Sequence, residues 1–376
     1  MNVLFTVNTY YPLKDGVQTV TGYLAEGLVR KGHNVTVVTT KNGNIDEEIY
    51  NGVRILRVDL YTRHTIYYGE KERYKKLIVE LANKCDVMIN VCTQNPMTDL
   101  IFTLLSGLKC KKILYMHGMY DSKWYKETFK SISDVSHKIW NNARWGVYYR
   151  NSARYFKMYD EIIQLNENDD AYTFFEKKYG IKSCVIGNAA DDNFFLDRKK
   201  LDEKYFLYVA NYMDGKNQKM VLKAFLEAEI SNEYKMIFIG STPNQYYTEL
   251  IMDYERCLSN KEKKVDFLFD VPKNEIPSYV YNAYLYLMGS KSEKFPMSIV
   301  ESMACGVPYI STNVGCLEQF PGGILVNDVK EMAQALKRLC ENEVERNQLS
   351  KEGKEYAISN FRVEDKINQL NSIIMN

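Results

Sequence analysis

The first half of the chain alternates short apolar runs with segments of helical periodicity. Residues 3–7 and 34–40 are valine-containing runs typical of buried strands, and residues 19–31 between them carry apolar side chains at helical spacing before Gly32. A strand, a helix and a strand joined by short connections form a βαβ unit with a right-handed crossover between parallel strands. Further strands are predicted at residues 53–58, 87–91, 113–117 and 161–165. This half is therefore predicted to be an α/β domain with helices on both faces of its sheet.

The same alternation returns in the second half. Residues 205–210 and 235–240 are predicted strands on either side of a helix at residues 218–228. Further strands are predicted at residues 265–271, 283–288, 309–312 and 324–326. A polar and charged stretch from Gly187 to Lys204 interrupts the periodicity and indicates a domain boundary.

We therefore predict two doubly wound Rossmann-like domains, residues 1–187 and 188–361, that face each other across a cleft. A C-terminal helix at about residues 362–376 could pack back on the first domain. Open α/β sheets bind their ligands at the carboxyl ends of the strands, so the cleft is the expected place for a ligand.

Composition and charge exclude several classes of protein. Lys and Arg number 49 against 48 Asp and Glu, a net charge of +1, so no overall basic excess favours nucleic acid. No apolar run approaches the roughly 18 residues of a membrane-spanning helix, and the first residues lack the basic region of a signal peptide. The eight cysteines form no C-x-x-C pair, which is typical of free thiols in a reducing compartment. We expect a cytoplasmic protein without a structural metal ion.

The most informative stretch of the second half surrounds two glutamates. Pro296 suits the first turn of a helix over residues 297–304, so Glu293 lies in the loop before this helix and Glu301 in its second turn. The first backbone N–H groups of a helix lack an intrahelical acceptor and can bind a phosphate; here they belong to Met297, Ser298 and Ile299. Carboxylates on either side can accept hydrogen bonds from sugar or ribose hydroxyls. The alternative is an ordinary helix with a cap-like acid and a surface glutamate.

The stretch at residues 293–308 resembles the E-x7-E motif of the family 4 glycosyltransferases, retaining enzymes with the GT-B fold, with Lys294 and Ser302 replacing the usual Gly and Ala. Other segments are similar to the family's landmarks in the same order: N-A-A-D-D-N-F at 188–194, Y-V-A-N-Y-M-D-G-K-N-Q at 208–218, Gly315 with Glu318, and G-G-I-L-V at 322–326. In the first half, the loop at 12–16 and the strand end at 114–118 are similar to the family's glycine loop and H-G element. The resemblance covers nearly the whole chain.

The resemblance implies roles for particular residues. In the family, the glutamate at position 293 contacts sugar hydroxyls of a nucleotide-sugar donor, the one at 301 contacts the ribose, and Lys216 matches the lysine that binds the diphosphate. His117 is expected to contact the donor sugar, although a lone histidine is often only structural. Without the resemblance, Lys216 would be interpreted as a solvated lysine in a turn. The catalytic residues implied are His117, Lys216 and Glu293, and the donor-binding residues are Gly16, Asn211, Val271, Phe295, Met297, Ser298 and Glu301.

Two departures from the family pattern affect the diphosphate site. The usual arginine five residues before the lysine is Asn211, so Lys219 or Lys294 compensates or the donor is held more loosely. The usual double glycine of the first-domain loop is Asp15-Gly16, which leaves the backbone less free at position 15. The chain contains no D-x-D motif, so we expect no metal ion on the diphosphate, and fixed charges and helix amides would neutralise it.

Residues 123–157 combine aromatic and basic side chains. The segment holds all three tryptophans and eight Lys or Arg against two acidic residues. One stripe at helical spacing contains Trp145, Tyr148, Tyr149, Tyr155, Phe156 and Tyr159. The stripe either packs against the first sheet as core or forms a peripheral surface on an anionic membrane, where Trp and Tyr lie at the headgroups. Nucleic acid could also use bases and aromatics in this way, but the rest of the chain supplies no such binding fold.

The expected function follows from the resemblance. It is a metal-independent transfer of a sugar, with retention, from a UDP- or GDP-type donor to a glycan acceptor, in a setting of bacterial polysaccharide assembly on a lipid-linked acceptor. No separate cofactor is implied, and the site of action would be the cytoplasm or the inner face of the plasma membrane. Two alternatives remain open: another GT-B enzyme, such as a phosphorylase or a nucleotide-sugar epimerase, and a non-catalytic donor-binding partner of another transferase.

Overall fold

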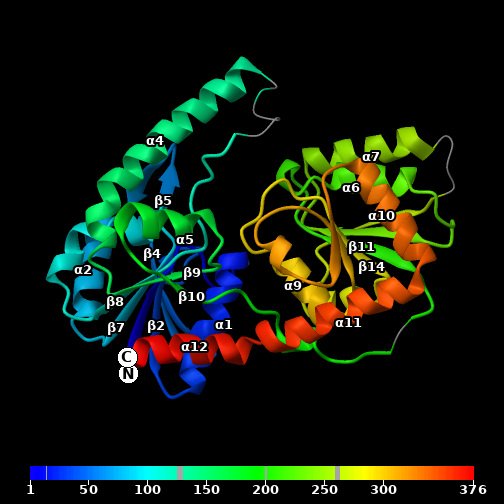
Figure 1. Ribbon diagram of the computed structural model, residues 1–376. Coiled ribbons are helices and arrows are strands. Elements are labelled where there is room, and N and C mark those ends of the chain that lie inside the picture. The colour runs from blue at the N-terminus through cyan, green and yellow to red at the C-terminus, as the bar shows by residue number, and fades with distance from the viewer. Residues whose placement is uncertain (14, 125–128, 130, 200, 259–262) are drawn as a thin grey trace. The chain divides into compact units, whose positions relative to one another are not determined.

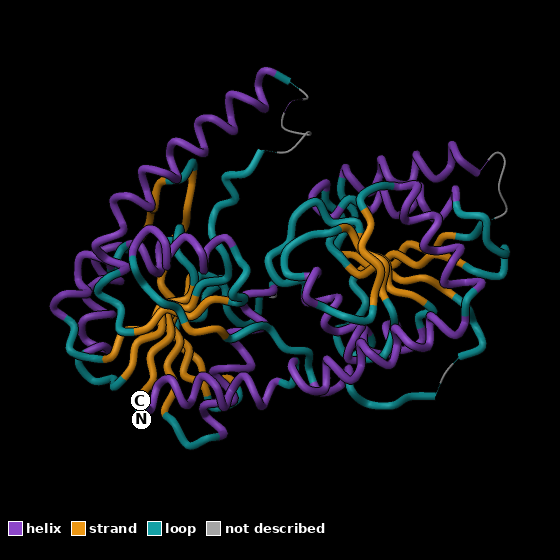
Figure 2. The backbone as a smooth tube through the Cα atoms, viewed as in Figure 1, coloured by secondary structure: helices purple, strands orange, loops and turns teal. Residues whose placement is uncertain are grey.

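A computed structural model (Figure 1) describes residues 1–13, 15–124, 129, 131–199, 201–258 and 263–376. The chain forms two compact units. Unit 1 contains Met1–Ile186 and Ile367–Asn376, and unit 2 contains Gly187–Lys366. In each unit the strands form a central layer with helices packed on both sides (Figure 2). The chain passes from unit 1 to unit 2 after Ile186, and it returns to unit 1 at Ile367, within a C-terminal helix that begins at Val363, close to the expected start.

Unit 1 is built on a sheet that, over the described residues, has eight strands in the order β10-β9-β8-β7-β1-β2-β4-β3. Their bounds are β1 (Asn2–Thr6), β2 (Asn34–Thr40), β3 (Glu47–Tyr50), β4 (Val53–Val58), β7 (Val87–Val91), β8 (Lys111–Tyr115), β9 (Glu161–Gln164) and β10 (Cys184–Val185). Neighbouring strands are parallel except for β3 with β4, and β5 (Leu60–Arg63) with β6 (Ile66–Gly69) forms a separate hairpin. Every residue of β7 is buried, as expected for a parallel strand covered on both faces.

The helices of unit 1 are α1 (Gly16–Arg30), α2 (Lys71–Ala82), α3 (Pro96–Asp99), η1 (Phe102–Gly107), α4 (Ile132–Phe156), α5 (Asp170–Phe174) and η3 (Phe175–Tyr179). Helix α1 begins three residues before the expected start, because the Asp15 carboxylate accepts a hydrogen bond from Gln18 N at 2.7 Å and caps the helix. The C-terminal helix α12 (Val363–Met375) packs its Ile367 against Gly27 of α1, where a Cβ atom would lie 2.3 Å from the isoleucine side chain.

The aromatic stripe of α4 belongs to the core of unit 1. Tyr149, Phe156 and Tyr159 are buried, and Trp145, Tyr148 and Tyr155 are partly buried against the same core cluster. The first of the two alternatives for this stripe is therefore confirmed, and contact of residues 123–157 with an anionic membrane stays a prediction. Residues 125–128 and 130 of the basic segment, with Lys126 and Lys130, lie outside the described residues.

Unit 2 is built on a sheet that, over the described residues, has six strands, all parallel, in the order β13-β12-β11-β14-β15-β16. Their bounds are β11 (Tyr205–Val209), β12 (Lys235–Gly240), β13 (Val265–Phe269), β14 (Leu285–Met288), β15 (Tyr309–Thr312) and β16 (Gly323–Val326). Numbered within the unit, this is the 3-2-1-4-5-6 order of a Rossmann fold, as predicted.

Helices cover both faces of the unit 2 sheet. Their bounds are η4 (Asp192–Phe194), η5 (Asp214–Lys216), α6 (Gln218–Glu227), α7 (Gln245–Leu258), α8 (Ile276–Asn282), α9 (Met297–Ala304), η6 (Leu317–Gln319), α10 (Val329–Glu341) and α11 (Glu343–Asn360). Helices α6 and α10 pack together on one face, and α9 and α11 pack together on the other (Figure 1).

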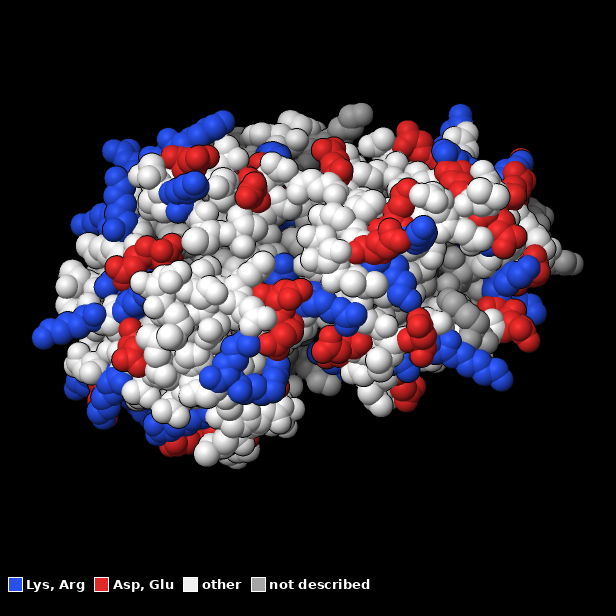
Figure 3. Space-filling model, turned by 60° about the horizontal axis from the view of Figure 1, so that its bottom comes forward, with Lys and Arg blue, Asp and Glu red and all other residues white. Residues whose placement is uncertain are grey.

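The surface mixes both signs of charge. Over most of the face shown in Figure 3, Lys and Arg side chains are interspersed with Asp and Glu side chains. Such mixing favours neither a broad anionic nor a broad cationic partner on this face. Among the described helices, none has both the length and the apolar character needed to cross a bilayer.

A buried lysine caps the C-terminus of helix α6. The Lys263 side chain is buried, and its Nζ donates hydrogen bonds to the carbonyls of Phe225 at 2.6 Å and of Ala228. These carbonyls lie at the C-terminus of α6, where the backbone lacks intrahelical donors and the helix dipole favours a cation. The opposite end of α6 follows directly after η5 and Lys216, so this cap stabilises a helix that supports the site.

Replacement of Lys263 by Met is expected to lower the free energy of unfolding of unit 2 by about 2–3 kcal/mol, because buried carbonyls would lose a charged donor. All three tryptophans lie in unit 1, so Trp fluorescence follows unit 1 while far-UV circular dichroism follows both units. In a urea titration, only the dichroism transition should move. Lys264→Met, at an exposed neighbouring position, is the matched control. Equal transitions for the two variants would contradict the capping role.

Candidate functional site

The candidate site lies where the strand order of unit 2 reverses. From β11 the chain proceeds outward through β12 to β13, then returns to β14 on the other side of β11. Loops that leave the carboxyl ends of β11 and β14 therefore diverge, and open α/β sheets bind ligands at such a point. Lys216 follows β11 and Glu293 follows β14. The fold thus brings together two of the residues singled out in the sequence.

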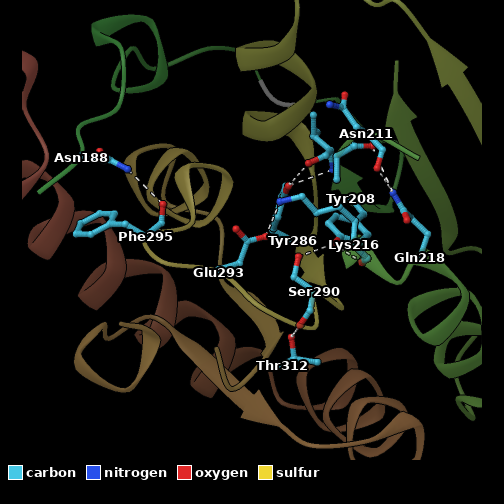
Figure 4. A network of polar contacts seen from close by, with 12 residues as sticks. Asn188, Tyr208, Asn211, Lys216, Gln218, Tyr286, Ser290, Glu293, Phe295 and Thr312 are labelled. Atoms are coloured by element: carbon cyan, nitrogen blue, oxygen red, sulfur yellow. Dashed lines mark hydrogen bonds and ion pairs between the residues drawn. The ribbon is translucent and has the colours of Figure 1, made fainter. Parts of the chain in front are cut away.

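Lys216 and Glu293 form an ion pair. The Lys216 Nζ lies 2.5 Å from the Glu293 Oε1, and their side chains are 32% and 15% exposed (Figure 4). Lys216 ends the short helix η5, and Asn217, which follows it, has a φ of 51°, a left-handed conformation that asparagine tolerates. A charge pair that is shielded in part from water interacts more strongly than one on the open surface.

Tyr208 forms polar contacts with residues of both loops. Its buried hydroxyl donates to the carbonyl of Lys216 at 2.7 Å and lies 3.2 Å from the Ser290 Oγ (Figure 4). The Ser290 carbonyl accepts a hydrogen bond from the Thr312 hydroxyl at 2.6 Å, which ties this loop to β15. The loops that present the ammonium and the carboxylate are therefore anchored by buried hydroxyl groups rather than by the ion pair alone.

Two glycines allow the backbone to come close around the pair. A Cβ atom on Gly289 would lie 2.9 Å from the carbonyl oxygen of Asn217, so the end of β14 touches the turn after Lys216. Gly315 has a φ of +63°, and a Cβ atom there would lie 2.9 Å from the carbonyl oxygen of Glu293. Both positions require glycine for the loops to hold this arrangement.

Helix α9 presents the start of its first turn beside this loop. Pro296 occupies the cap position, and the N–H groups of Met297 and Ser298 come where the helix supplies no acceptor. The N–H of Ile299, which was also expected to be available, instead donates to the Pro296 carbonyl at 3.2 Å. The tight first turn uses this donor, so two helix amides rather than three are positioned for an anion.

Glu301, within α9, is a carboxylate with an altered environment. Burial raises its pKa from 4.5 to about 7, an effect that nearby Lys273 reduces and nearby Asp191 increases. The carboxyl is therefore partly protonated near neutral pH in the ligand-free protein. A perturbed carboxyl at the carboxyl edge of a Rossmann sheet is a candidate for ligand binding.

Tyr286 links the glutamates of the motif to β11. Its hydroxyl accepts from the N–H of Val209 and donates to the Val209 carbonyl, both at 3.1 Å, and the Ser298 side chain also hydrogen-bonds to it. Burial raises the pKa of this phenol, and the charges of Glu293 and Glu301 raise it further. Tyr286 therefore lies near both carboxylates and keeps the start of α9 in register with the sheet.

Three other predicted residues have contacts of their own. Asn211 is exposed, and its carbonyl accepts a hydrogen bond from the Gln218 Nε2 at 2.9 Å. The Phe295 side chain packs into an aromatic cluster with Phe320 and Phe361, so only its backbone can face a ligand. Val271 follows the edge strand β13 and is partly buried.

Neither lysine named as a substitute for the missing arginine is shown in that role. Lys219 pairs with Glu249 at 2.8 Å and with Asp253 at 3.6 Å, which directs its charge toward α7. Lys294 is partly buried in the loop before α9. A further cation, Lys291, pairs with Asp214 at 2.6 Å beside the turn that carries Lys216.

His117 and Gly16 belong to unit 1. The His117 ring stacks on Tyr115, the last residue of β8, with centroids 5.0 Å apart, and its Nε2 is buried without a hydrogen-bond partner among the described residues. Burial lowers its pKa to about 4, so the ring is neutral at pH 7. Gly16 is the first residue of α1 rather than part of a loop, and a Cβ atom there would meet nothing within 4 Å.

Sequence reasoning missed Tyr208, Tyr286 and Ser290. The two tyrosines lie within predicted apolar strands, and Ser290 lies two residues after the end of the second of these strands. A buried phenol needs a hydrogen-bond partner, so a tyrosine inside a parallel strand could have indicated a polar contact at the sheet edge. Over the part of the chain that the structure describes, no group of three or more His, Cys, Asp or Glu side chains could hold a metal ion.

Two family models match successive parts of the chain. Residues 14–192 match the model described as Glycosyltransferase Family 4, and residues 190–356 match the model described as Glycosyl transferases group 1. Their junction at residues 190–192 lies close to the division between units 1 and 2. The two matches together cover both units.

Individual relatives are distant. The chain is 27% identical over 178 residues to N-acetyl-alpha-D-glucosaminyl L-malate synthase of Bacillus anthracis, covering 46% of this chain and 45% of the relative. It is 24% identical over 235 residues to the O-antigen biosynthesis glycosyltransferase WclY of Escherichia coli, covering 59% and 60%. These matches therefore span about half of the length of each relative.

A solved structure extends the likeness to the whole chain. Anabaena HepE, determined in complex with UDP and glucose, is similar with a TM-score of 0.72 and 15% identity, over 100% of this chain and 99% of that one. At this identity the likeness shows the fold. Together with the family matches and the two Rossmann-like units, it establishes that the chain belongs to the family 4 glycosyltransferases and has the GT-B fold.

Proposed function

We propose that this glycosyltransferase transfers a sugar, with retention, from a nucleotide-sugar donor to a hydroxyl of a glycan acceptor. The observation that carries the proposal is the Lys216–Glu293 ion pair at the reversal point of the unit 2 sheet. A nucleotide sugar offers a matching partner to each member of the pair. Its diphosphate carries negative charge for the ammonium, and its sugar hydroxyls can donate hydrogen bonds to the carboxylate.

In this proposal Lys216 acts on the leaving group. The bond from the anomeric carbon to the diphosphate oxygen breaks, its electron pair stays with the nucleoside diphosphate, and the acceptor hydroxyl bonds to the same face of the sugar. A fixed ammonium beside the departing diphosphate stabilises the charge that develops there, and one such preorganised donor is worth about 3 kcal/mol in other enzymes. Met297 N–H and Ser298 N–H at the start of α9 would add to this electrostatic field.

Glu293 and Glu301 would hold the two ends of the donor. Glu293 orients the sugar through its hydroxyls, and Glu301 accepts a hydrogen bond from the ribose. Neutral His117 is assigned to a donor-sugar contact, because its buried, unpartnered Nε2 can either donate or accept a hydrogen bond. The same proposal assigns the backbone near Val271 to the base of the donor and Gly16 of unit 1 to the donor.

The donor and acceptor classes are supported by the relatives. HepE was determined with UDP and glucose, and WclY is named for O-antigen biosynthesis. We therefore propose a UDP-type donor, with GDP as the alternative, and an acceptor that is a growing, lipid-linked bacterial glycan. The direct test is release of nucleoside diphosphate that requires an acceptor, since a phosphorylase or an epimerase would not show that requirement.

A second candidate function is a non-catalytic donor-binding partner of another transferase. Asn211 replaces the family's arginine, and the charge of Lys219 is directed to Glu249 rather than toward the site. Donor binding without turnover across a broad acceptor panel would favour this candidate.

Lys216→Ala and Glu293→Gln are each expected to lower kcat/KM at least about tenfold, which corresponds to about 1.4 kcal/mol of lost transition-state stabilisation. The matched control is Lys204→Ala with Glu233→Gln. This pair, 3.0 Å apart, lies at the opposite, amino-terminal edge of the same sheet. Near-normal kcat/KM in both site variants would remove these residues from the catalytic assignment.

Glu301→Gln is expected to stabilise the ligand-free protein and to weaken nucleotide binding. The pKa of Glu301 is higher in the folded protein than its ordinary value of 4.5, so wild-type stability falls as the pH rises from about 4.5 to about 7. Glutamine abolishes this loss, which gives the variant an advantage of up to about 3 kcal/mol at pH 8 and little at pH 4. Thermal unfolding at both pH values, with and without UDP or GDP, measures both effects. The control is Glu341→Gln on the exposed side of α10; equal pH profiles for the two variants would contradict the assignment.

EDTA is expected to leave activity largely unchanged, because the proposed leaving-group stabilisation comes from Lys216 and the α9 amides. The measurement is acceptor-dependent release of nucleoside diphosphate before and after chelation. Loss of activity that magnesium or manganese restores would show that a metal ion takes part.

A further inference from the structure

A second ion pair joins the two loops that carry Lys216 and Glu293. The Lys291 Nζ lies 2.6 Å from the Asp214 Oδ2, and the Lys291 N–H donates to the Gly215 carbonyl at 2.9 Å. Lys216 and Glu293 come two residues later in their respective loops, and each pair joins positions 77 apart in the chain. The turn after β11 and the loop after β14 therefore lie side by side in one register. We call Asp214–Lys291 the outer pair and Lys216–Glu293 the inner pair.

The two pairs differ in how far water reaches them. Asp214 of the outer pair is 80% exposed, whereas Glu293 of the inner pair is 15% exposed. The two lysine side chains are equally exposed, at 32% each. An ion pair with a well-hydrated member contributes little to stability, because water and salt screen the attraction. Lys291 can therefore leave Asp214 at low cost, and Asp214 then stays hydrated.

The donor of the proposed reaction brings more negative charge than the inner pair can balance. Each phosphate of a nucleoside diphosphate sugar carries a negative charge, and the inner pair offers them one ammonium, that of Lys216. Glu293 adds a carboxylate to the same place. The amides of Met297 and Ser298 supply partial rather than full charge. A second cation on these loops would therefore strengthen the binding of a diphosphate.

The position of Lys291 suits a ligand that it shares with Lys216. Its backbone N–H is bonded to Gly215, the residue before Lys216, so the two lysines start from adjacent points of the same turn. The long, flexible stem of a lysine lets each ammonium reach a shared anion. Lys219, in contrast, is held by two carboxylates of α7, at 2.8 Å and 3.6 Å. Lys291 has the more readily exchanged partner of the two.

We propose that Lys291 is a second donor-binding cation, whose ammonium leaves Asp214 when the nucleotide sugar binds and contacts the diphosphate beside Lys216. This inference rests on the proposed transfer reaction and extends its binding site from the inner pair to the outer pair. The two ammonium groups bind the same diphosphate, so both pairs open when the donor arrives. Asp214 is the counter-ion of Lys291 in the ligand-free site and competes with the ligand for it.

Titration calorimetry of the full-length chain measures this contact without turnover. UDP and GDP are the charged probes, and uridine and guanosine are the probes without phosphate. Lys291→Met is expected to weaken the binding of the diphosphate about tenfold and to leave the affinity for the nucleoside unchanged. Binding of the diphosphate to this variant should also fall less steeply with added salt than binding to wild type. Unchanged affinity of Lys291→Met for the diphosphate would overturn the proposal.

Asp214→Asn separates a ligand contact from a structural tie between the loops. Lys291→Met and Asp214→Asn both break the outer pair, but Asp214→Asn leaves the ammonium in place for a phosphate. We therefore expect Asp214→Asn to bind the diphosphate at least as tightly as wild type, and Lys291→Arg, which keeps the charge, to retain most of the wild-type affinity. Equal weakening by Lys291→Met and Asp214→Asn would show that the outer pair acts as a tie between the loops, and this result would overturn the proposal.

Two further lysines complete the comparison. Lys223→Met is the matched control, because it removes a lysine of α6 that is 65% exposed and pairs with Glu227, and wild-type affinity is expected. Lys294→Met removes the other lysine of the loop before α9, and weakening by this variant in place of Lys291→Met would overturn the proposal. Wild-type protein that binds neither UDP nor GDP would contradict the proposed donor class as well, whereas wild-type binding that Lys291→Met leaves unchanged would overturn this inference alone.

Discussion

The site of unit 2 depends on a partly buried pair of opposite charges, Lys216 and Glu293, which the surrounding loops must hold in contact. Desolvation of two charges can outweigh their attraction, so such a pair persists only where the surrounding structure holds its geometry. Here the geometry comes from several sources. The parallel order brings β11 beside β14, the Tyr208 hydroxyl fastens the Lys216 backbone, and Gly289 and Gly315 allow close approach of the loops.

The same pair bears on the proposed binding of a nucleotide sugar. Each charge of the pair satisfies the other at 2.5 Å. In the proposed complex, the diphosphate and the sugar hydroxyls of the donor would replace these partners, so neither side chain would be left buried and unpaired. Glu301 contrasts with this arrangement, since burial raises the pKa of its carboxyl to about 7. A carboxyl whose pKa is raised by folding lowers the stability of the folded protein at neutral pH.

Helix α4 shows that one amphipathic pattern can be assigned to the wrong environment. Both of its faces carry aromatic or large aliphatic residues, and periodicity places residues on a face without saying what covers that face. The structure puts Tyr149 and Phe156 in the core and leaves Ile132 and Trp140 exposed.

Local sequence patterns predict most of the strands and helices and the order in which they occur. Strands such as 53–58, 87–91, 235–240 and 309–312 and the helix at 297–304 have the bounds that were predicted, because continuous apolar runs and helical spacing are local signals. The family motif also placed Lys216 and Glu293 in one site. Short or polar elements such as β3 and the β5–β6 hairpin escaped prediction, since their pairing rather than their composition makes them strands.

Which polar groups contact one another depends on the tertiary fold. The pairing of Tyr208 with Lys216 and Ser290 joins residues up to 82 positions apart, and no periodicity encodes a contact between loops after different strands. The same holds for the use of the Ile299 amide within its own turn, for the direction of Lys219 toward Glu249, and for the protonation of Glu301. Each depends on distances and burial, which arise only when the strands of unit 2 are assembled into one sheet.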